Sequence, residues 1–292
     1  MSTTPTQGIL LIATSHPFYG RMAVNLANTI KAVNPDIPIS ILTDDIGLNH
    51  LNDREKSLFY SIIQVEVERG LIGINRLRMY LPRYSPFKET LAMDADTLWL
   101  PKARVSDAFS LLNGRDFTIV NEGYYDLDKM KDHGTRPYTH WAEPEEIKEA
   151  YGLTGKLWKV RGEFVLFRKG AVITKLFKTA RDIQKAPKVD VAKLGGAVTD
   201  EFALNVAMNI CGIDPHQAGW QPTYWPHMHG GQIPQVYNLH GYYAVSFGGN
   251  DLVRNAAKLY ATLCGNAAYK TGVRYRFMIH PKREFLKERI EN

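Results

Sequence analysis

The opening of the chain constrains the fold most strongly, because two short apolar runs flank one amphipathic segment. Residues 8–14 (GILLIAT) and 39–43 (ISILT) are bounded by glycine, proline or polar residues, a pattern that predicts buried strands. Between them, residues 18–33 carry apolar side chains at helical spacing, and Pro35 prevents the helix from continuing. This order is typical of two parallel strands joined by a right-handed crossover. The sequence therefore predicts an α/β fold.

The alternation of strand-like and helix-like segments continues along the chain. Further strands are predicted at 59–66, 90–94, 117–123 and 162–170, and further helices at 74–84, 143–152, 170–185 and 198–212. No internal repeat or Gly/Ser-rich linker divides these segments. With 292 residues, of which 45% are hydrophobic, the chain is long enough to bury one substantial core. We therefore expect a single α/β domain.

The composition disfavours several classes of protein. No segment of the sequence approaches the roughly 18 consecutive apolar residues of a membrane span. The N-terminus lacks the basic start and the small-residue cleavage site of a signal peptide. The two cysteines, Cys211 and Cys264, are too few for a disulfide framework. Together these features predict a cytoplasmic protein without a membrane span.

Basic residues are in excess, with a formal net charge of +6 and a pI of about 9.1. They are concentrated in residues 269–292, where Tyr275 and Phe277 stand among lysines and arginines. One interpretation is a terminal helix with a solvated basic face, and the other is a surface for nucleic acid or an anionic membrane. The sequence by itself leaves both open.

Two aspartates, Asp94 and Asp96, interrupt a hydrophobic stretch at the end of the strand predicted at 90–94. Carboxylates two residues apart in an extended chain project to the same side. In an open α/β sheet, ligands bind beyond the carboxyl ends of the strands. The pair can therefore hold Mg²⁺ or Mn²⁺, which in turn binds a diphosphate. The alternative is that both aspartates only cap a turn.

A second Asp-x-Asp, formed by Asp126 and Asp128, shows that the triplet alone has little weight. A chain of this composition contains about one such triplet by chance. The second triplet has no strand pattern before it and lies in a polar segment. The sequence context therefore favours Asp94 and Asp96 as the metal-binding pair.

Four stretches of the chain resemble the GT-A fold glycosyltransferases of the glycogenin and lipopolysaccharide galactosyltransferase family. They are residues 9–45, 74–100, 199–205 (TDEFALN) and 236–242 (VYNLHGY), so the resemblance covers roughly residues 1–250. It implies a Rossmann-like mixed sheet flanked by helices in a single domain, residues 1–292. Within this domain, it implies a nucleotide-sugar-binding half (1–120), an acceptor half (121–250) and a basic C-terminal extension (251–292).

The resemblance also implies a donor site. It places the nucleotide beside the end of the first strand and the metal–diphosphate at the Asp-x-Asp, and it makes a late histidine the third metal ligand. The implied residues are Ala13, Thr14 and Tyr19 for the nucleotide, Asp94, Ala95 and Asp96 for the metal–diphosphate, and His240 as the third ligand. For His240 the alternative is a core histidine bonded to the backbone.

Three further residues match positions that contact the donor in the family. Arg76 falls where the family keeps an arginine near the sugar diphosphate, and Asp200 and Glu201 fall where an acidic residue reaches the donor sugar. Arg76 as a solvent-facing residue and Asp200 as a helix cap after Thr199 are the alternatives. Glu201 stands where the family often has glutamine.

The chain departs from the family after the histidine of VYNLHGY. The family usually has a Lys-Pro-Trp there that grips phosphate, whereas this chain reads HGYYAVSFGGN, without a lysine. The cation that binds phosphate is therefore expected to be Arg76, Arg78 or a residue of the basic tail.

The leading hypothesis is a metal-dependent glycosyltransferase that uses a nucleotide sugar, a UDP-sugar, with Mg²⁺ or Mn²⁺. The resemblance implies retention of the anomeric configuration. An inverting enzyme would instead need a general base, for which Glu122, Asp126 and Glu163 are the candidates. The second hypothesis, a sugar-nucleotidyltransferase, conflicts with the single glycine in TSHPFYGR (14–21). The third, a non-enzymatic nucleic-acid-binding protein, leaves the strand-end carboxylates unexplained.

The acceptor is open at the level of sequence. The positive charge and basic tail favour a polyanionic acceptor such as hydroxymethylated pyrimidine in bacteriophage DNA, in which case the enzyme works in the host cytoplasm. The aromatic loop around Trp220, Tyr224 and Trp225 is expected to contact either a flipped base or a sugar. A lipopolysaccharide, an oligosaccharide or a protein hydroxyl is the alternative acceptor.

Overall fold

The structure is a computed structural model. It describes residues 5–68, 71–134, 141–194, 197–217, 219–226, 235–248 and 256–274. The basic segment from residue 275 onward, including Tyr275 and Phe277, and the histidines His227 and His229 lie outside the described residues.

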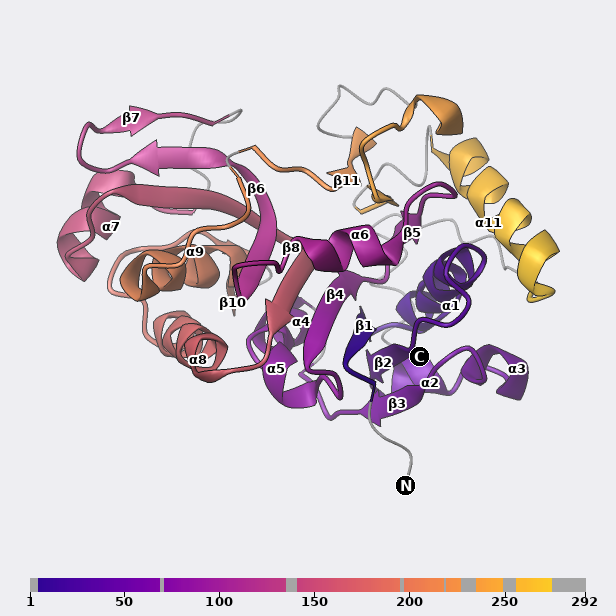
Figure 1. The fold of residues 1–292 in the computed structure, drawn as a ribbon. Coiled ribbons are helices and arrows are strands. Elements are labelled where there is room, and N and C mark those ends of the chain that lie inside the picture. Colours follow the sequence, from indigo (N-terminus) through magenta and orange to yellow (C-terminus); the bar gives the residue numbers. More distant parts are fainter. Residues whose placement is uncertain are drawn as a thin grey trace.

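A mixed seven-stranded sheet forms the centre of the molecule (Figure 1). Its strand order is β3-β2-β1-β4-β8-β6-β7. The first four strands in this order are parallel to one another, whereas β8, β6 and β7 add antiparallel pairs. The bounds are β1 (Gln7–Ala13), β2 (Ile39–Thr43), β3 (Ser61–Gln64), β4 (Glu89–Asp94), β6 (Phe117–Asp126), β7 (Lys131–Asp132) and β8 (Lys156–Arg168). The α/β class and the mixed sheet expected from the sequence are thus confirmed.

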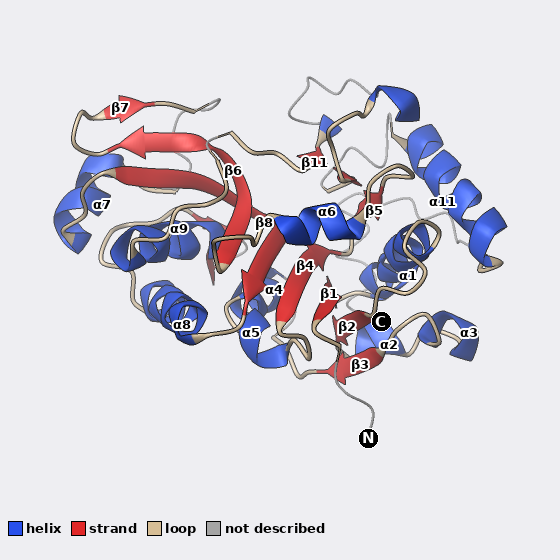
Figure 2. Cartoon of the chain, in the orientation of Figure 1, coloured by secondary structure: helices blue, strands red, loops and turns tan. Residues whose placement is uncertain are grey.

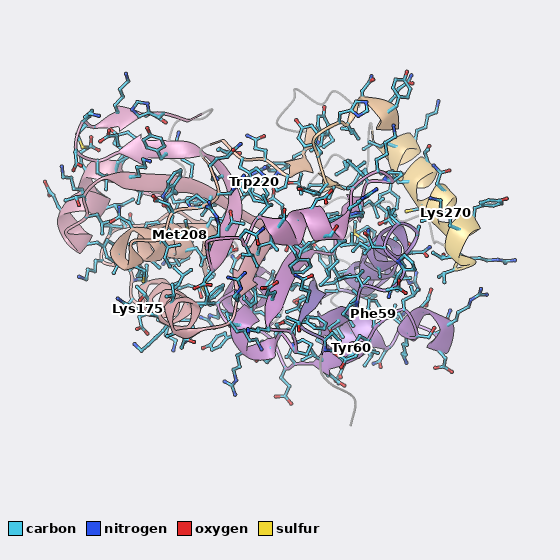
Figure 3. All side chains as sticks on the ribbon, viewed as in Figure 1. Phe59, Tyr60, Lys175, Met208, Trp220 and Lys270 are labelled. Atoms are coloured by element: carbon cyan, nitrogen blue, oxygen red, sulfur yellow. The ribbon has the colours of Figure 1, made fainter. Side chains whose placement is uncertain are left out.

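Helices cover both faces of this sheet and enclose two apolar clusters (Figure 2). On one face, α1 (Pro17–Lys31) packs against α11 (Ala257–Thr271). On the other face lie α4 (Leu71–Arg78), α5 (Leu81–Tyr84), α8 (Ala171–Lys185) and α9 (Asp200–Cys211). Figure 3 shows the side chains of both layers, with Met208 of α9 on one side and Lys270 of α11 at the opposite edge.

The helix predicted at 74–84 is two short helices in the structure, and the prediction of one continuous helix is wrong. The helix α4 ends at Arg78, Tyr80 leaves the helical conformation with φ of −114° and ψ of 10°, and Pro82 then stands in the first turn of α5. Proline is tolerated in the first turn of a helix, but inside a continuous helix it removes a hydrogen bond. The break is therefore located at Met79 and Tyr80.

A small three-stranded sheet lies across the end of β4. It consists of β5 (Thr97–Trp99), β12 (Ala244–Ser246) and β11 (Thr223–Tyr224), with β12 antiparallel to β5. The backbone N–H of Phe247 donates to the carbonyl of Asp96 at 2.7 Å. This contact fixes the late part of the chain beside the Asp-x-Asp.

The remaining elements are short apart from α7. Their bounds are α2 (Asp45–Leu48), α3 (Asp53–Lys56), α6 (Val105–Ser110), α7 (Pro144–Tyr151), β9 (Lys193–Leu194), β10 (Ala197–Val198) and the 3₁₀ helix η2 (Val236–Asn238). Among the helices that the structure describes, none has the length and apolar character needed to cross a membrane.

The second Asp-x-Asp does follow a strand, contrary to the expectation from sequence, because β6 extends to Asp126. Its carboxylates bind backbone groups of a turn: Asp126 accepts from the N–H groups of Asp128 and Lys129 at 3.1 and 3.0 Å. Asp128 accepts from the N–H of Gly155 at 3.1 Å. The strand context therefore fails to separate the two triplets. What separates them is that Asp94 and Asp96 line a pocket, whereas Asp126 and Asp128 bind the backbone of a turn.

Candidate active site

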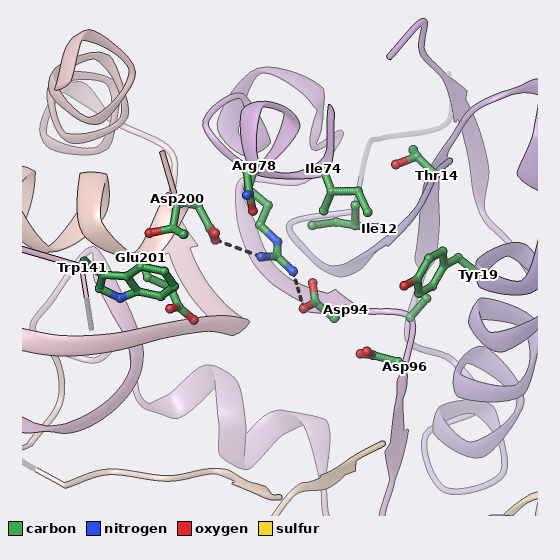
Figure 4. Close-up of a pocket in the computed structure, with 13 residues that line it drawn as sticks. Ile12, Thr14, Tyr19, Ile74, Arg78, Asp94, Asp96, Trp141, Asp200 and Glu201 are labelled. Carbon is green, nitrogen blue, oxygen red and sulfur yellow. Dashed lines mark hydrogen bonds and ion pairs between the residues drawn. The ribbon is translucent and has the colours of Figure 1, made fainter. Parts of the chain in front are cut away.

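A pocket of about 200 Å³ opens beyond the carboxyl ends of β1 and β4 (Figure 4). This is the edge at which open α/β sheets bind their ligands. The lining residues come from both halves of the chain: Ile12, Thr14, Tyr19, Ile74, Asn75, Arg78, Asp94, Ala95, Asp96, Trp141, Thr199, Asp200 and Glu201. Seven of them, Thr14, Tyr19, Asp94, Ala95, Asp96, Asp200 and Glu201, were predicted from the sequence.

The turn between β1 and α1 brings Thr14 and Tyr19 to the pocket. His16 caps α1 by accepting a hydrogen bond from the N–H of Phe18 at 3.1 Å, and the N–H of Ser15 donates to Asp44 at 2.6 Å. The hydroxyl of Thr14 is buried and has no hydrogen-bond partner among the described residues. Because an unpaired buried hydroxyl is costly, Thr14 is suited to bind a polar atom of a ligand.

Asp94 and Asp96 project from the turn that joins β4 to β5. The Thr97 hydroxyl closes this turn by donating to the Asp94 carbonyl at 2.8 Å. Burial raises the pKa of Asp94 to about 7 and that of Asp96 to about 6, and repulsion from nearby carboxylates adds to the rise. Arg78 opposes both shifts.

Arg78 joins two elements of the pocket that are distant in sequence. Its guanidinium forms one ion pair with Asp94 of β4 and a second with Asp200 of α9, the latter at 3.1 Å (Figure 4). Gly162 of β8 lies directly behind this arrangement, since a Cβ at that position would overlap the Asp200 carboxylate and lie 3.3 Å from Arg78. The absence of a side chain at residue 162 is therefore required for the Arg78–Asp200 pair.

The first turn of α9 presents Asp200 and Glu201. Thr199 caps this helix by accepting from the N–H of Phe202 at 3.2 Å, so the carboxylate of Asp200 is not the cap and pairs with Arg78 instead. Burial raises the pKa of Glu201 to about 8, and repulsion from Asp200 and Glu163 contributes. The ring of Trp141 lies beside Glu201 at this end of the pocket (Figure 4).

The charge balance of the pocket fits a divalent cation. Four carboxylates, those of Asp94, Asp96, Asp200 and Glu201, share one arginine, and burial together with repulsion from nearby carboxylates raises the pKa of Asp94, Asp96 and Glu201. Among the described residues, no group of three His, Cys, Asp or Glu side chains has a metal-binding arrangement. Mg²⁺ and similar ions are commonly held by one or two carboxylates together with substrate phosphates. Asp94 and Asp96 can supply the two carboxylates.

The structure does not bring Arg76, which the resemblance placed near the sugar diphosphate, to the pocket. Its side chain is 63% exposed and pairs with Glu68. Successive helix residues are rotated by about 100°. Arg76 and Arg78 therefore point about 200° apart, and only Arg78 faces the carboxylates. The spacing of Ile74 and Arg78, four residues apart on one helix face, is the sequence signal that could have identified this arginine.

His240 and Ala13 also lie away from the pocket lining. His240 is exposed and lines a separate depression of about 500 Å³ with Tyr237 and Tyr242. Gly248, eight residues after His240, is the residue of this part of the chain that comes close to Asp96. A Cβ on residue 248 would lie 3.1 Å from the Asp96 carboxylate. Ala13 is buried within β1, and its carbonyl accepts from the hydroxyl of Thr43 at 2.7 Å. The pocket residues that sequence reasoning missed are Ile12, Ile74, Asn75, Trp141 and Thr199.

Comparison of the fold with solved structures identifies glycosyltransferases, although no family model and no curated protein matches the sequence. The galactosyltransferase LgtC, in complex with donor and acceptor sugar analogs, superposes with a TM-score of 0.58 and 14% identity over 96% of this chain and 99% of its own. Mouse xyloside xylosyltransferase 1 superposes with a TM-score of 0.51 and 12% identity, over 85% of this chain and 99% of its own. The bifunctional glycosyltransferase WbbM superposes with a TM-score of 0.58 and 11% identity, over 92% of this chain and 50% of its own. The chain therefore has the GT-A fold of these proteins.

Proposed function

We propose that the protein is a glycosyltransferase that moves a sugar from a nucleotide sugar to a hydroxyl acceptor. The observation that carries this proposal is the convergence of Asp94, Asp96, Arg78 and Asp200 in one pocket at the carboxyl ends of β1 and β4. The GT-A fold shared with LgtC and the xylosyltransferase supports the same reaction class.

The donor is a UDP-sugar held with Mn²⁺ or Mg²⁺. Asp94 and Asp96 would hold the metal, which would supply positive charge to neutralise the diphosphate as it departs. Tyr19 and Thr14 contact the nucleoside, because both line the pocket beside the end of β1.

Arg78 has the position required to stabilise the departing phosphate. Its guanidinium pairs with Asp94 and Asp200. If Asp94 held a metal, the guanidinium would be able to donate a hydrogen bond to a phosphate oxygen of the donor. Arg78 thus supplies the cation that the missing Lys-Pro-Trp segment would otherwise provide.

The transfer retains the configuration of the sugar, which is a hexose or a pentose. The acceptor oxygen bonds to C1 as the bond from C1 to the phosphate oxygen breaks, and the acceptor proton passes to the departing phosphate. Positive charge develops on the sugar ring in the transition state. Asp200 and, when ionised, Glu201 stabilise this charge and orient the ring, and neither forms a bond to it.

The acceptor is a hydroxymethylated pyrimidine of DNA, for which the support is the net charge of +6 and the basic C-terminal sequence. Phosphate neutralisation by lysine and arginine makes such binding fall steeply with salt. The competing acceptors are a lipopolysaccharide, an oligosaccharide or a protein hydroxyl. Transfer of labelled sugar to hydroxymethylcytosine DNA, to unmodified DNA and to an oligosaccharide mixture distinguishes them.

The reaction class is tested by incubating the protein with UDP-glucose or UDP-galactose and Mn²⁺ and measuring UDP release. We expect release that EDTA stops and that is lost in Asp96→Ala. Asp128→Ala in the second Asp-x-Asp is the matched control and should release UDP at the unaltered rate. Undiminished UDP release in EDTA would exclude the metal-dependent reaction, and release of pyrophosphate from a sugar phosphate and UTP would identify a nucleotidyltransferase.

A further inference from the structure

A second charged cluster lies on β8, next to the pocket, and the reaction proposed above does not use it. Its centre is Arg161, whose side chain is only 7% exposed. Arg161 pairs with Glu122 of β6 at 3.4 Å and with Glu163 at 3.1 Å. The indole ring of Trp225 stacks over the guanidinium at 5.1 Å.

Glu163 is held in this cluster through one of its two carboxylate oxygens, Oε1. The hydroxyl of Thr223 donates to Oε1 of Glu163 at 2.9 Å, and Arg161 contacts the same oxygen. Within the described residues, Oε2 accepts no hydrogen bond. The carboxylate is therefore fixed in position and retains a free acceptor atom.

The position of β8 places this carboxylate beside the pocket. Gly162 contacts the Arg78–Asp200 pair, while its neighbour Glu163 reaches toward β11, which belongs to the small sheet that binds Asp96. In the antiparallel register of β4 and β8, Met93 pairs with Phe164, so Glu163 comes level with Asp94 at the end of β4. Glu163 therefore lies at the same end of β4 as the metal-binding turn.

A purely structural role does not account for this cluster well. The three guanidinium nitrogens of Arg161 are buried and make no hydrogen bond of good geometry among the described residues. A buried ion pair is commonly no more stabilising than an apolar replacement, and incomplete hydrogen bonding makes it less so. A network of this kind is more readily explained if it positions a group for a ligand.

We propose that Glu163, positioned by Arg161 and Thr223, accepts a hydrogen bond from the attacking hydroxyl of the acceptor. This inference rests on the proposed glycosyltransferase function and assigns the acceptor end of its site. Glu163 takes up the single proton of this hydroxyl as the oxygen bonds to C1 and then passes it to the departing phosphate, so Glu163 is unchanged at the end of the reaction. Because Asp96 and Glu201 lie nearby, the group bound there is an uncharged hydroxyl and not a phosphate.

Two other carboxylates that the sequence offered near the acceptor are less suitable. Glu122 is directed into the cluster, where its Oε1 faces Arg161 and is buried. Asp126 lies at the outer end of β6 and caps the turn that follows. Glu163 is therefore the carboxylate of this set whose second oxygen is not engaged by the cluster, whose side chain is 12% exposed, and which lies level with Asp94 at the end of β4.

The experiment compares Glu163→Gln with the wild type in the UDP-release assay with UDP-glucose or UDP-galactose and Mn²⁺. Water serves as the acceptor hydroxyl in this assay, so the natural acceptor need not be known. Glutamine keeps the shape of the side chain and can still accept from Thr223, but it loses the charge. We expect kcat to fall roughly 30- to 100-fold, the scale of one hydrogen bond to a charged group, with the donor KM and the Mn²⁺–UDP affinity unchanged.

Arg161 is tested as a positioning residue. Arg161→Met should lower kcat without raising the donor KM, and Arg161→Lys should restore part of the loss because it keeps the charge. Asp126→Asn is the matched control on the neighbouring strand and should behave as the wild type. Thermal melting of each variant reports whether the fold is retained.

The possible outcomes are distinct. An unchanged kcat in Glu163→Gln, or a fall in Mn²⁺–UDP affinity that accounts for the whole loss, overturns the assignment of Glu163. A wild-type protein that neither binds UDP nor releases it from any UDP-sugar refutes the glycosyltransferase itself, and the acceptor role of Glu163 falls with it.

Discussion

Arg78 and Asp200 are 122 residues apart in the sequence, yet their side chains form an ion pair at 3.1 Å in the wall of the pocket. The pair joins the end of α4 to the start of α9, and a second ion pair extends it to Asp94 of β4. One guanidinium thus connects the metal-binding turn, the helix beside the donor sugar and the space for the diphosphate.

Replacement of Arg78 by methionine should lower kcat/KM for UDP-sugar at least roughly 100-fold, because one well-placed donor to developing charge has about this effect. It should also lower the free energy of unfolding by about 3 kcal/mol at pH 8, since two carboxylates lose their partner. Urea unfolding and UDP release provide the measurements. Arg76→Met, two residues away and on the exposed face, is the control, and an equal loss in both variants would contradict the role of Arg78.

Asp96→Ala should abolish UDP release while the fold is retained. Asp96 contributes a carboxylate with a raised pKa, and its removal opens no apolar cavity, so the free energy of unfolding should not fall. Calorimetry with Mn²⁺ and UDP should show that tight binding of the metal–nucleotide complex is lost. Tight Mn²⁺-dependent binding of UDP by Asp96→Ala would be evidence against this metal site.

The stability of the metal-free protein should depend on pH in a defined direction. Burial raises the pKa values of Asp94, Asp96 and Glu201 from their ordinary values of 3.8, 3.8 and 4.5 to about 7, about 6 and about 8. The folded state therefore binds more protons than the unfolded state above about pH 4, so the stability from these groups is lost as pH rises toward 8.

Metal binding should reverse this loss, because the metal binds the ionised carboxylates. We expect the increase in Tm caused by Mn²⁺ to be small at pH 5 and to grow through pH 7. Melting curves at pH 5, 6, 7 and 8, with and without Mn²⁺ and UDP, measure the effect. A metal-induced increase in Tm that is the same at all four pH values would contradict the assigned carboxylates.

Gly162→Ala should reduce activity by moving Asp200 away from Arg78. The added methyl group would overlap the Asp200 carboxylate, which has to shift and lengthen the ion pair. Gly170→Ala is a suitable control, because the nearest atom to its Cβ is 4.0 Å away and its φ of 176° is open to any residue. We expect the control to retain full UDP release. Equal activity in both variants would show that the close approach of residue 162 to Asp200 does not affect the reaction.

His240→Ala should leave the Mn²⁺–UDP affinity unchanged. The histidine is exposed in a depression that it shares with Tyr237 and Tyr242, and it does not line the pocket that contains Asp94 and Asp96. Isothermal titration with Mn²⁺ and UDP measures the affinity. A loss of affinity of tenfold or more would restore His240 as a metal ligand and would require the late segment to move on binding.

The short strands of the small sheet were not predictable from sequence. The strands β5, β11 and β12 have two or three residues each, too few to show a period of two. They exist because residues distant in sequence pair with one another, as Thr97 does with Ser246. The same limitation applied to Glu163, whose partner Thr223 is 60 residues away.

The sequence by itself determined the local features that have a local physical cause. The β-α-β opening, the Asp-x-Asp at the end of β4 and the Thr199 cap that places Asp200 in the first turn of α9 all follow from periodicity, strand ends and capping. The tertiary structure alone decided which arginine enters the pocket. Arg76 and Arg78 lie on one helix, and its rotation is set by Leu77, which is buried against the sheet. Because this packing depends on surfaces distant in sequence, it directs Arg78 to Asp94 and Asp200 and leaves Arg76 in solvent.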